Sequence, residues 1–198
     1  MLIKRYLAIF FCCTLFWLLP FAAYADDAVT EVIDAEITLH NDHYVVSADM
    51  VYQLNKRATA ALQSGVPLFW SIQIKLLQHR NILWDKTLFK TEIHYRLQYQ
   101  ALLNSYRVTN ESSGETYNFS TLYAALDLMS AIHDVPLIEK SKISLKEDYL
   151  CALKVKFDSE LLPLPLRPLA YIDKQWFLSS NWTLWPLKKY NFLLTCLR

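Results

Sequence analysis

Alternation of apolar and polar side chains predicts β-strands along most of the chain. Apolar residues occupy every second position from Ala35 to Leu39 and again from Tyr44 to Tyr52, on either side of a His-Asn-Asp-His turn. A period of two places successive side chains on opposite faces, as expected of a half-buried strand. Asn and Asp tolerate the backbone angles of a tight turn. Residues 35–52 are therefore predicted to form a β-hairpin.

Three later segments show the same alternation. They are residues 68–76, 93–103 and 149–157, each with its apolar positions on one face and its polar positions on the other. The middle segment is the most regular, and its pattern continues through Tyr106 and Val108. We therefore predict one long strand in this region, which bends or changes sheet along its length.

Two segments follow a helical period instead. The apolar side chains of residues 54–64 fall on one helical face, and Gly65 follows where a C-terminal cap is expected. Residues 119–132 form the second predicted helix, with Ser120 as its N-cap. Because proline interrupts helices, Pro136 is expected to end this element.

The predicted elements together indicate an all-antiparallel architecture. The proline-rich segment 161–169 is expected to be an extended edge or a crossing between sheets. Long strands with one polar face, few helices and no βαβ rhythm favour two sheets packed face to face. We therefore predict a mainly β fold, an antiparallel β-sandwich with two short helical inserts, as a single domain over residues 26–186. Residues 187–198 are interpreted as a C-terminal tail.

The N-terminal residues 1–25 have the three parts of a secretory signal peptide. Two basic residues are followed by an uncharged apolar run, and the small residues Ala23 and Ala25 precede Asp26 at the spacing of a cleavage site. The sequence thus predicts cleavage after Ala25 and a periplasmic or otherwise secreted domain. The uncharged run is also long enough to span a bilayer, so an uncleaved anchor in the inner membrane is the alternative.

Composition then narrows the classes of function. The chain has 198 residues, of which 54% are hydrophobic, and a formal net charge of +1. This composition excludes a disordered chain, and the near-neutral charge argues against nucleic-acid binding. The chain has only 2 Gly, too few for the Gly-rich fingerprints that bind nucleotides. No cofactor is predicted.

Two of the four cysteines remain after the predicted signal peptide is removed. They are Cys151 and Cys196, which form a possible disulfide in an oxidising compartment. Two unpaired, buried thiols are the alternative. Since the spacing is not that of a Cys-x-x-Cys motif, a redox or zinc site is not expected.

Polar residues on the long predicted strand form a candidate binding surface. His94, Arg96, Gln98 and Gln100 alternate with apolar positions and therefore share one face of the sheet. Such a row suits an acidic or peptide ligand. A sheet face that is simply solvated shows the same pattern, so both explanations stay open.

No catalytic or metal-binding motif accompanies this row. His40 and His43 flank a turn that contains Asp42 and offers two nitrogens and a carboxylate, but solvation of a turn explains these residues equally. No Gly-x-Ser-x-Gly elbow or other triad signature is present. We therefore assign no catalytic residue and no metal ligand from the sequence.

Two aromatic regions have both a structural and a functional explanation. Trp176, Trp182 and Trp185 either close one end of the core or form an aromatic shelf for a ligand or a membrane interface. Arg80 and Asp85 flank an Asn-Ile-Leu-Trp sequence and are expected to clamp this loop by an ion pair.

A series of short motifs runs through the predicted domain. The motifs are Ala61-Leu62-x-x-Gly65-Val66-Pro67-Leu68, Arg80-Asn81-Ile82-Leu83-Trp84-Asp85, Leu97-x-Tyr99, Tyr106-Arg107-Val108, Thr121-Leu122-x-x-Ala125-Leu126 and Leu162-Pro163-Leu164-Pro165-Leu166. Their order and spacing resemble the bacterial secreted family catalogued as domain of unknown function 4390, from about Ala35 to Trp185. The resemblance implies a short exported protein with a role in the cell envelope. It implies no particular activity and no catalytic residue.

The leading interpretation is a non-enzymatic binding module of the periplasm or envelope. It would contact a protein partner by strand addition or through an aromatic patch. An envelope hydrolase with His94 or His133 as its base is one alternative. The other alternative is a structural protein in which residues 1–25 are not cleaved. These residues would then anchor the protein in the membrane.

Overall fold

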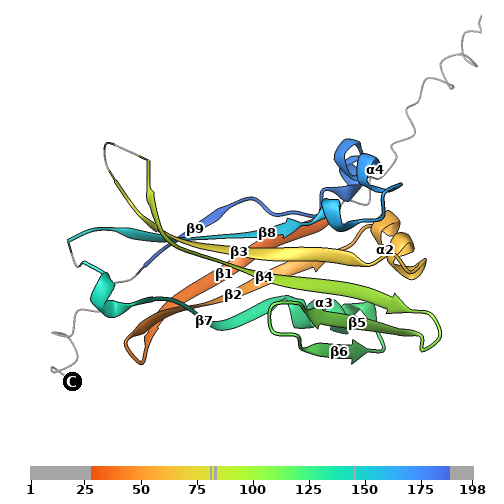
Figure 1. The fold of residues 1–198 in the computed structure, drawn as a ribbon, viewed down its shortest axis with the longest axis horizontal. Coiled ribbons are helices and arrows are strands. Elements are labelled where there is room, and N and C mark those ends of the chain that lie inside the picture. Colours follow the sequence, from red (N-terminus) through yellow and green to blue (C-terminus); the bar gives the residue numbers. More distant parts are fainter. Residues whose placement is uncertain (1–27, 81, 83, 145, 188–198) are drawn as a thin grey trace, which may run out of the picture.

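Two antiparallel β-sheets pack face to face in the computed structural model, which describes residues 28–80, 82, 84–144 and 146–187 (Figure 1). The strands of the smaller sheet are β1 (Val29–His40), β2 (His43–Gln53) and β7 (Ala131–Glu139). Those of the larger sheet are β3 (Leu68–Gln78), β4 (Lys86–Gln100), β5 (Ser105–Asn110), β6 (Thr116–Phe119), β8 (Tyr149–Phe157) and β9 (Thr183–Pro186). The strand orders are β1-β2-β7 and β6-β5-β4-β3-β8-β9. The predicted mainly β sandwich is therefore confirmed.

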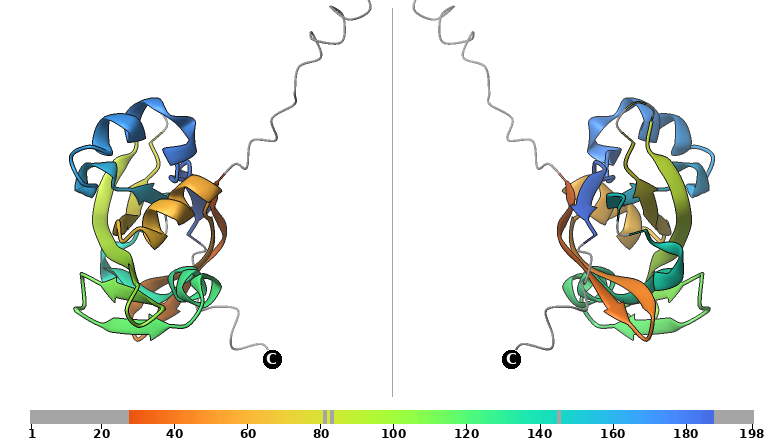
Figure 2. Two further views of the ribbon diagram at one scale, coloured as in Figure 1. Left: turned by 90° about the vertical axis from the view of Figure 1, so that its right-hand side faces the viewer. Right: turned by 90° about the vertical axis from the view of Figure 1, so that its left-hand side faces the viewer.

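Short helices lie at one end of this sandwich and beside the β5–β6 hairpin (Figures 1 and 2). They are α2 (Lys56–Gln63), α3 (Leu122–Met129) and α4 (Arg167–Ile172), with single 3₁₀ turns at 140–142, 159–161 and 174–176. None of the helices within the described ranges has the length and apolar character needed to cross a bilayer. The two predicted helical inserts correspond to α2 and α3, and α4 is an addition to them.

The N-cap of α3 is Thr121 and not the predicted Ser120, because the Thr121 hydroxyl accepts a hydrogen bond from the Ala124 N–H at 3.2 Å. This helix also ends earlier than expected, at Met129. The chain then passes into strand β7, which contains Pro136. Proline is tolerated there because β7 pairs only with β2 and lies at the edge of its sheet.

The prediction of one continuous strand through residues 93–108 was wrong. The chain reverses at residues 101–104, and β4 and β5 pair with each other as a hairpin. Asn104 takes a left-handed conformation, with φ of 47°, and its side chain accepts a hydrogen bond from the Tyr99 hydroxyl at 2.7 Å. The alternation continued across the turn because exposed leucines occupy it, so periodicity alone could not detect the reversal.

The prediction of an extended segment at 161–169 was also wrong. This region contains a 3₁₀ turn followed by α4, and Pro168 lies in the first turn of the helix. The first N–H groups of a helix have no partner within the helix, so proline costs nothing at this position. The prolines therefore mark a helix start and not an extended strand.

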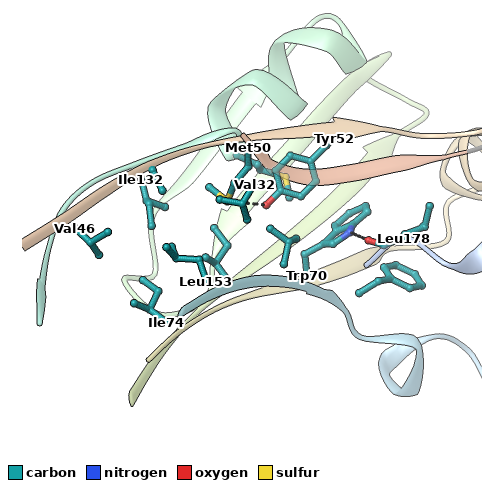
Figure 3. Close-up of a cluster of buried hydrophobic side chains, with 14 of the residues drawn as sticks. Val32, Val46, Met50, Tyr52, Trp70, Ile74, Ile132, Leu153 and Leu178 are labelled. Carbon is teal, nitrogen blue, oxygen red and sulfur yellow. Dashed lines mark hydrogen bonds between the residues drawn. The ribbon is translucent and has the colours of Figure 1, made fainter. Parts of the chain in front are cut away.

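Side chains from both sheets form one hydrophobic core (Figure 3). Trp70 lies toward the α2 end, where its ring meets Tyr52 edge-on at 5.9 Å and Phe157 at 5.3 Å between centroids. The Trp70 Nε1–H donates a hydrogen bond to the Leu178 carbonyl at 3.2 Å. Aliphatic side chains fill the core further along, among them Val46, Ile74, Ile132 and Leu153.

Serine side chains extend the pairing of β8 beyond the start of β9. The Ser180 hydroxyl accepts a hydrogen bond from the Val155 N–H at 2.9 Å, and the Ser179 hydroxyl accepts one from the Phe157 N–H at 2.8 Å. These bonds replace part of a backbone ladder and satisfy buried donors of β8. They also hold the chain between α4 and β9 against the larger sheet.

Candidate binding surface

The predicted polar row lies on the outer face of the larger sheet. His94, Arg96 and Gln98 alternate along β4 with side chains that point toward the core, such as the buried Leu97. Strand pairing places each of them beside polar neighbours on β3 and β5: His94 opposite Ser71, and Gln98 opposite Arg107. The structure thus brings the predicted row together with residues of the strands that precede and follow β4 in the chain.

Gln100 occupies the end of this row and differs from the other three residues. It is opposite Ser105 at the β4–β5 turn, and its Oε1 atom is buried. Within the described part of the chain this oxygen has no hydrogen-bond partner. Gln100 therefore contributes less to an accessible surface than Gln98 does.

Glu92 is the centre of a polar network on the same face. Its carboxylate lies 2.7 Å from Lys90 Nζ, 3.5 Å from Gln73 Nε2 and 3.9 Å from His94 Nε2. The hydrogen bond from Lys90 lowers the pKa of Glu92 below its ordinary value, although partial burial acts in the opposite direction. Glu92 is therefore ionised at neutral pH and compensates part of the local positive charge.

Loop carboxylates pair with two further cations of this face. Arg96 Nε lies 3.3 Å from Glu111, and Lys156 Nζ lies 2.9 Å from Asp158. The hydrogen bond to Asp158 raises the pKa of Lys156, so this side chain stays charged over the whole physiological range. Both pairs are partly exposed and orient the cations without removing them from solvent.

Two lysines of the face contact an aromatic ring in place of a carboxylate. Lys75 Nζ lies 4.2 Å from the centroid of the Trp182 ring, and Lys154 Nζ lies 5.9 Å from it. Neither lysine has an ion-pair partner among the residues that the structure describes. They are therefore available to an anionic ligand, with Trp182 beside them as an aromatic contact.

The three C-terminal tryptophans have separate roles. Trp176 is buried and stacks with Phe157, with 6.1 Å between ring centroids, and Trp185 packs against the core from β9. Trp182 is 39% exposed and lies on the outer face of the larger sheet. Trp176 and Trp185 thus pack against the core at different places along β8, near Phe157 and opposite Cys151, and do not close a single end of it. An aromatic shelf at Trp182 stays a prediction.

The two sheets differ sharply in charge. The strands of the smaller sheet contain no Lys or Arg. Their carboxylates, all exposed, are Glu31, Asp34, Glu36, Asp49, Asp134 and Glu139. The strands of the larger sheet contain one carboxylate, that of Glu92. Their basic residues are Lys75, Lys86, Lys90, Arg96, Arg107, Lys154 and Lys156.

A near-zero net charge therefore conceals two faces of opposite sign. We call the outer side of the larger sheet the basic face, defined by Lys75, Lys90, Arg96, Arg107, Lys154 and Lys156. Sequence reasoning identified only the β4 portion of this face. The cations of β3 and β8 lie on the polar sides of strands that the sequence predicts, but periodicity does not say that these strands are neighbours of β4 in one sheet.

The residues weighed as catalytic bases do not converge. His94 lies on the larger sheet and His133 on the smaller one. The closest carboxylate contact of the His94 ring is the 3.9 Å approach to Glu92, and the nearby Ser112 hydroxyl bonds to the His94 backbone N–H. Across the described ranges, no group of three or more His, Cys, Asp or Glu is arranged to hold a metal ion.

The loop between β3 and β4 is clamped differently from the predicted ion pair. Asp85 Oδ1 lies 3.0 Å from His79 Nδ1 and accepts a hydrogen bond from the Arg80 backbone N–H at 3.3 Å. The Arg80 guanidinium forms no ion pair with Asp85. The carboxylate was correctly identified as the organising group, but its partners are a histidine ring and a backbone donor.

Two of the predicted sites fall wholly or partly outside the described residues. Ala23, Ala25 and Asp26 lie in the N-terminal part that is not described, and so does Cys196 at the other end. Cys151 is completely buried, and burial raises the pKa of its thiol to about 12. Signal cleavage and pairing of Cys151 with Cys196 therefore remain predictions.

Comparison with known protein families shows a match over most of the chain. The family described as domain of unknown function (DUF4390) matches residues 27–186, which covers the whole sandwich. Searches of the curated proteins and of the solved structures gave no match to this chain.

Proposed function

The chain belongs to the family described as domain of unknown function (DUF4390), and from that premise we propose that it is an exported, non-enzymatic binding module of the cell envelope. Its partner is an acidic protein segment, bound by the basic face. The observation that carries this proposal is the separation of charge between the two sheets. A module of this kind needs no cofactor and acts by bringing proteins together.

Export is supported by the N-terminal sequence. The basic start, the uncharged run and the small residues Ala23 and Ala25 before Asp26 together form a signal-peptide pattern. Mass spectrometry of the protein isolated from its producing cells is expected to find Asp26 at the N-terminus. Detection of Met1 in the mature protein would instead support an inner-membrane anchor.

An acidic partner is supported by the chemistry of the basic face. Lys75 and Lys154 are half-buried cations without a carboxylate partner in the described part of the chain, and Arg107 bonds only to the neutral Asn118 side chain. Complementary charge attracts a partner over several ångströms and orients it as it binds. Trp182, held beside the lysines, adds an aromatic contact of the type enriched in interfaces.

Strand addition is the second binding mode that the edges offer. Three edges are poor acceptors: β6 is short, β9 is short and contains Pro186, and β7 contains Pro136. The remaining edge, β1, is long but carries a bulge between Val32 and Asp34 and several carboxylates. An added strand at β1 would therefore have to be basic, which distinguishes this mode from the acidic partner of the basic face.

Site-specific photocrosslinking in the producing cells tests the proposal. We would place p-benzoylphenylalanine at Gln98 on the basic face and, as a matched control, at Asp49 on the smaller sheet. The Gln98 position is expected to crosslink to an acidic protein, and the Asp49 position is not. A crosslink from Asp49 alone, to a basic partner, would contradict the proposal.

Charge reversal then separates specific binding from chance contact. Lys75→Glu combined with Lys154→Glu should reduce the Gln98 crosslink at least about tenfold, since close charge pairs at interfaces contribute more than 1.4 kcal/mol. The control variant is Glu31→Lys combined with Asp34→Lys on the smaller sheet. It changes the net charge by the same amount but toward positive, and it should leave the Gln98 crosslink intact. Equal loss in both double variants would exclude the basic face as the binding surface.

A further inference from the structure

A hollow of about 460 Å³ adjoins the basic face at the end of β8 that lies near α4 (Figure 1). Lys154 of the basic face lines it, and so do four aromatic side chains, for which we call it the aromatic hollow. They are Phe157, Tyr171, Trp176 and Phe177. Pockets that bind ligands occupy about 300–1,000 Å³, so this hollow is large enough for a side chain of a partner.

The aromatic side chains of the hollow differ in their exposure. Phe157 and Trp176 are buried and stack on each other, with 6.1 Å between ring centroids. Tyr171 and Phe177 are 59% and 58% exposed. Exposed apolar groups that gather at one place often mark a contact site. Since aromatic rings pack well against one another, a further ring is the side chain that suits this lining best.

Contacts with α2 hold this part of the chain in place. The Asn55 side chain donates a hydrogen bond to the Gln175 carbonyl at 2.6 Å, and Arg57 forms an ion pair with Asp173 at 2.6 Å. The serine hydroxyls that bond to β8 anchor the chain just beyond Phe177. The aromatic hollow is therefore formed before a partner binds, which lowers the entropy cost of binding.

The carboxylates around the hollow have partners of their own. They pair as Asp158 with Lys156 at 2.9 Å, Asp173 with Arg57 at 2.6 Å, and Glu160 with the Tyr171 hydroxyl at 3.4 Å. Glu31 lines a different groove. Lys154 is the charged residue of the hollow's lining, and within the described ranges it has no ion-pair partner. An anionic group of a partner is thus the complement that Lys154 lacks.

Lys154 also joins the hollow to the rest of the basic face. Its Nζ atom lies 5.9 Å from the centroid of the Trp182 ring, and Lys75 Nζ lies 4.2 Å from the same centroid. Asn181, the residue before Trp182, lines the hollow. Alternate side chains of an extended segment are about 7 Å apart, so one short segment can meet the hollow and a neighbouring lysine together.

We propose that the aromatic hollow binds an aromatic side chain of the acidic partner, one that has an Asp or Glu within two residues of it. The ring packs against Tyr171 and Phe177, and the carboxylate pairs with Lys154. This inference rests on the acidic partner proposed above and adds the residue by which that partner is selected. Aromatic side chains seated in pockets supply much of the affinity of an interface, whereas charge pairs orient the partner.

The β3–β4 hairpin of a second copy of the chain fits the hollow less well. Trp84 is 90% exposed there and is followed by Asp85. The Asp85 carboxylate, however, already contacts the His79 ring and accepts a hydrogen bond from the Arg80 backbone N–H. It would have to leave these contacts to pair with Lys154. We therefore assign the hollow to a different protein.

Selection of displayed peptides tests the proposal without knowledge of the natural partner. The exported chain, as isolated from cells, would be immobilised and offered a phage library of random dodecapeptides. We expect the selected sequences to contain an aromatic residue with Asp or Glu within two positions, at least about threefold more often than the unselected library, because both groups add affinity. A random library includes every order and spacing of these residues.

Two double variants provide a matched comparison. Tyr171→Ala with Phe177→Ala removes the exposed rings of the hollow, and should weaken binding of a selected peptide at least about tenfold while the preference for acidic residues remains. Tyr117→Ala with Tyr123→Ala removes two other exposed rings, 42% and 80% exposed, and should leave binding unchanged. Since all four residues are exposed, both variants should keep the unfolding temperature of the parent protein.

Photocrosslinking in the producing cells gives a second measurement, in which an aromatic side chain stays in place. p-Benzoylphenylalanine at Tyr171 is expected to capture the same acidic protein as p-benzoylphenylalanine at Gln98. The matched control is Tyr123, an exposed tyrosine on α3, where no crosslink to that protein is expected.

The results separate this inference from the proposed function. Acidic peptides selected without an aromatic residue, or a crosslink from Gln98 without one from Tyr171, would overturn the aromatic hollow and leave the acidic partner in place. Loss of the acidic preference as well, with no crosslink from Gln98, would overturn both. Self-association of the chain that is lost in Trp84→Ser would assign the hollow to a second copy and thus also overturn the inference.

Discussion

Cys151 and Glu92 belong to the same sheet, yet their surroundings shift their pKa values in opposite directions. Cys151 points into the core, where burial disfavours the thiolate and raises the pKa to about 12. Glu92 points outward, where the Lys90 ammonium holds the carboxylate in its charged form and lowers its pKa. The face that a residue occupies thus decides its chemistry more than its type does.

Burial makes Cys151 unreactive in the folded protein. In reduced protein at neutral pH, iodoacetamide should leave Cys151 unmodified, because the thiolate is scarce and the sulfur is inaccessible. Unfolding in denaturant should expose it to full modification. Peptide mass mapping measures both states, and rapid labelling of Cys151 in the native protein would contradict this environment.

Acidification should destabilise the protein partly through Glu92. A carboxyl group whose pKa is lower in the folded than in the unfolded state stabilises the fold above its unfolded pKa, and this contribution is lost as the pH falls through the folded pKa. The loss is therefore expected below about pH 4.3. Urea titrations at neutral pH and at about pH 3 should show a smaller decrease in stability for Glu92→Gln than for the parent protein. An equal decrease would show that the Lys90 contact does not affect folding.

The N-caps of α2 and α3 are alike in sequence but differ in their tertiary contacts. Both α2 and α3 begin with a polar side chain that accepts a hydrogen bond from the third residue beyond it, Asn55 in α2 and Thr121 in α3. Asn55 is buried and also donates to the Gln175 carbonyl, whereas the Thr121 cap is exposed. We therefore expect the cap of α2 to contribute more to the free energy of unfolding than the cap of α3.

Asn55→Ala should lower the free energy of unfolding by about 3 kcal/mol. It removes the helix cap, worth about 1 kcal/mol, and leaves the Gln175 carbonyl without its donor, which costs about 2 kcal/mol more. Thr121→Ala removes only a cap and should cost about 1 kcal/mol. Chemical denaturation of both variants checks the difference. Similar losses in the two would mean that Asn55 is no more than a helix cap.

Local pattern predicted those elements whose boundaries are marked by residues with one strong preference. The turn between β1 and β2, helix α2 and strand β8 follow the expected positions closely, although β1 begins at Val29 and not at Ala35, and Gly65 follows α2 with a positive φ of 90°. The reversal at residues 101–104 has no glycine or proline, and Pro168 begins a helix that was expected to be extended. In these two places the local signal has more than one solution, because Asn104 can take a left-handed conformation without being glycine and proline is accepted in the first turn of a helix as well as in an extended segment.

At the scale of the whole molecule, both sheets depend on one core. Leu153 is completely buried between them, and Leu184 on β9 is 55% exposed. Leu153→Ala should reduce the free energy of unfolding by about 2–5 kcal/mol, since it creates a cavity, and Leu184→Ala should change it by less than about 0.5 kcal/mol. Tryptophan fluorescence and far-UV circular dichroism should report the same midpoint for Leu153→Ala. Separate midpoints would show that the sheets unfold independently.

The sequence alone determined the strand periodicity, the mainly β class and the polar row from His94 to Gln98, because these depend on which side of a strand a residue points to. Only the tertiary structure decided the strand order, which places Lys75 of β3, Arg107 of β5 and Lys154 of β8 around that row. Periodicity is a local property, whereas pairing joins segments far apart along the chain. For this reason a chain of near-neutral charge was found to have one basic and one acidic face only when its strands were placed in their sheets.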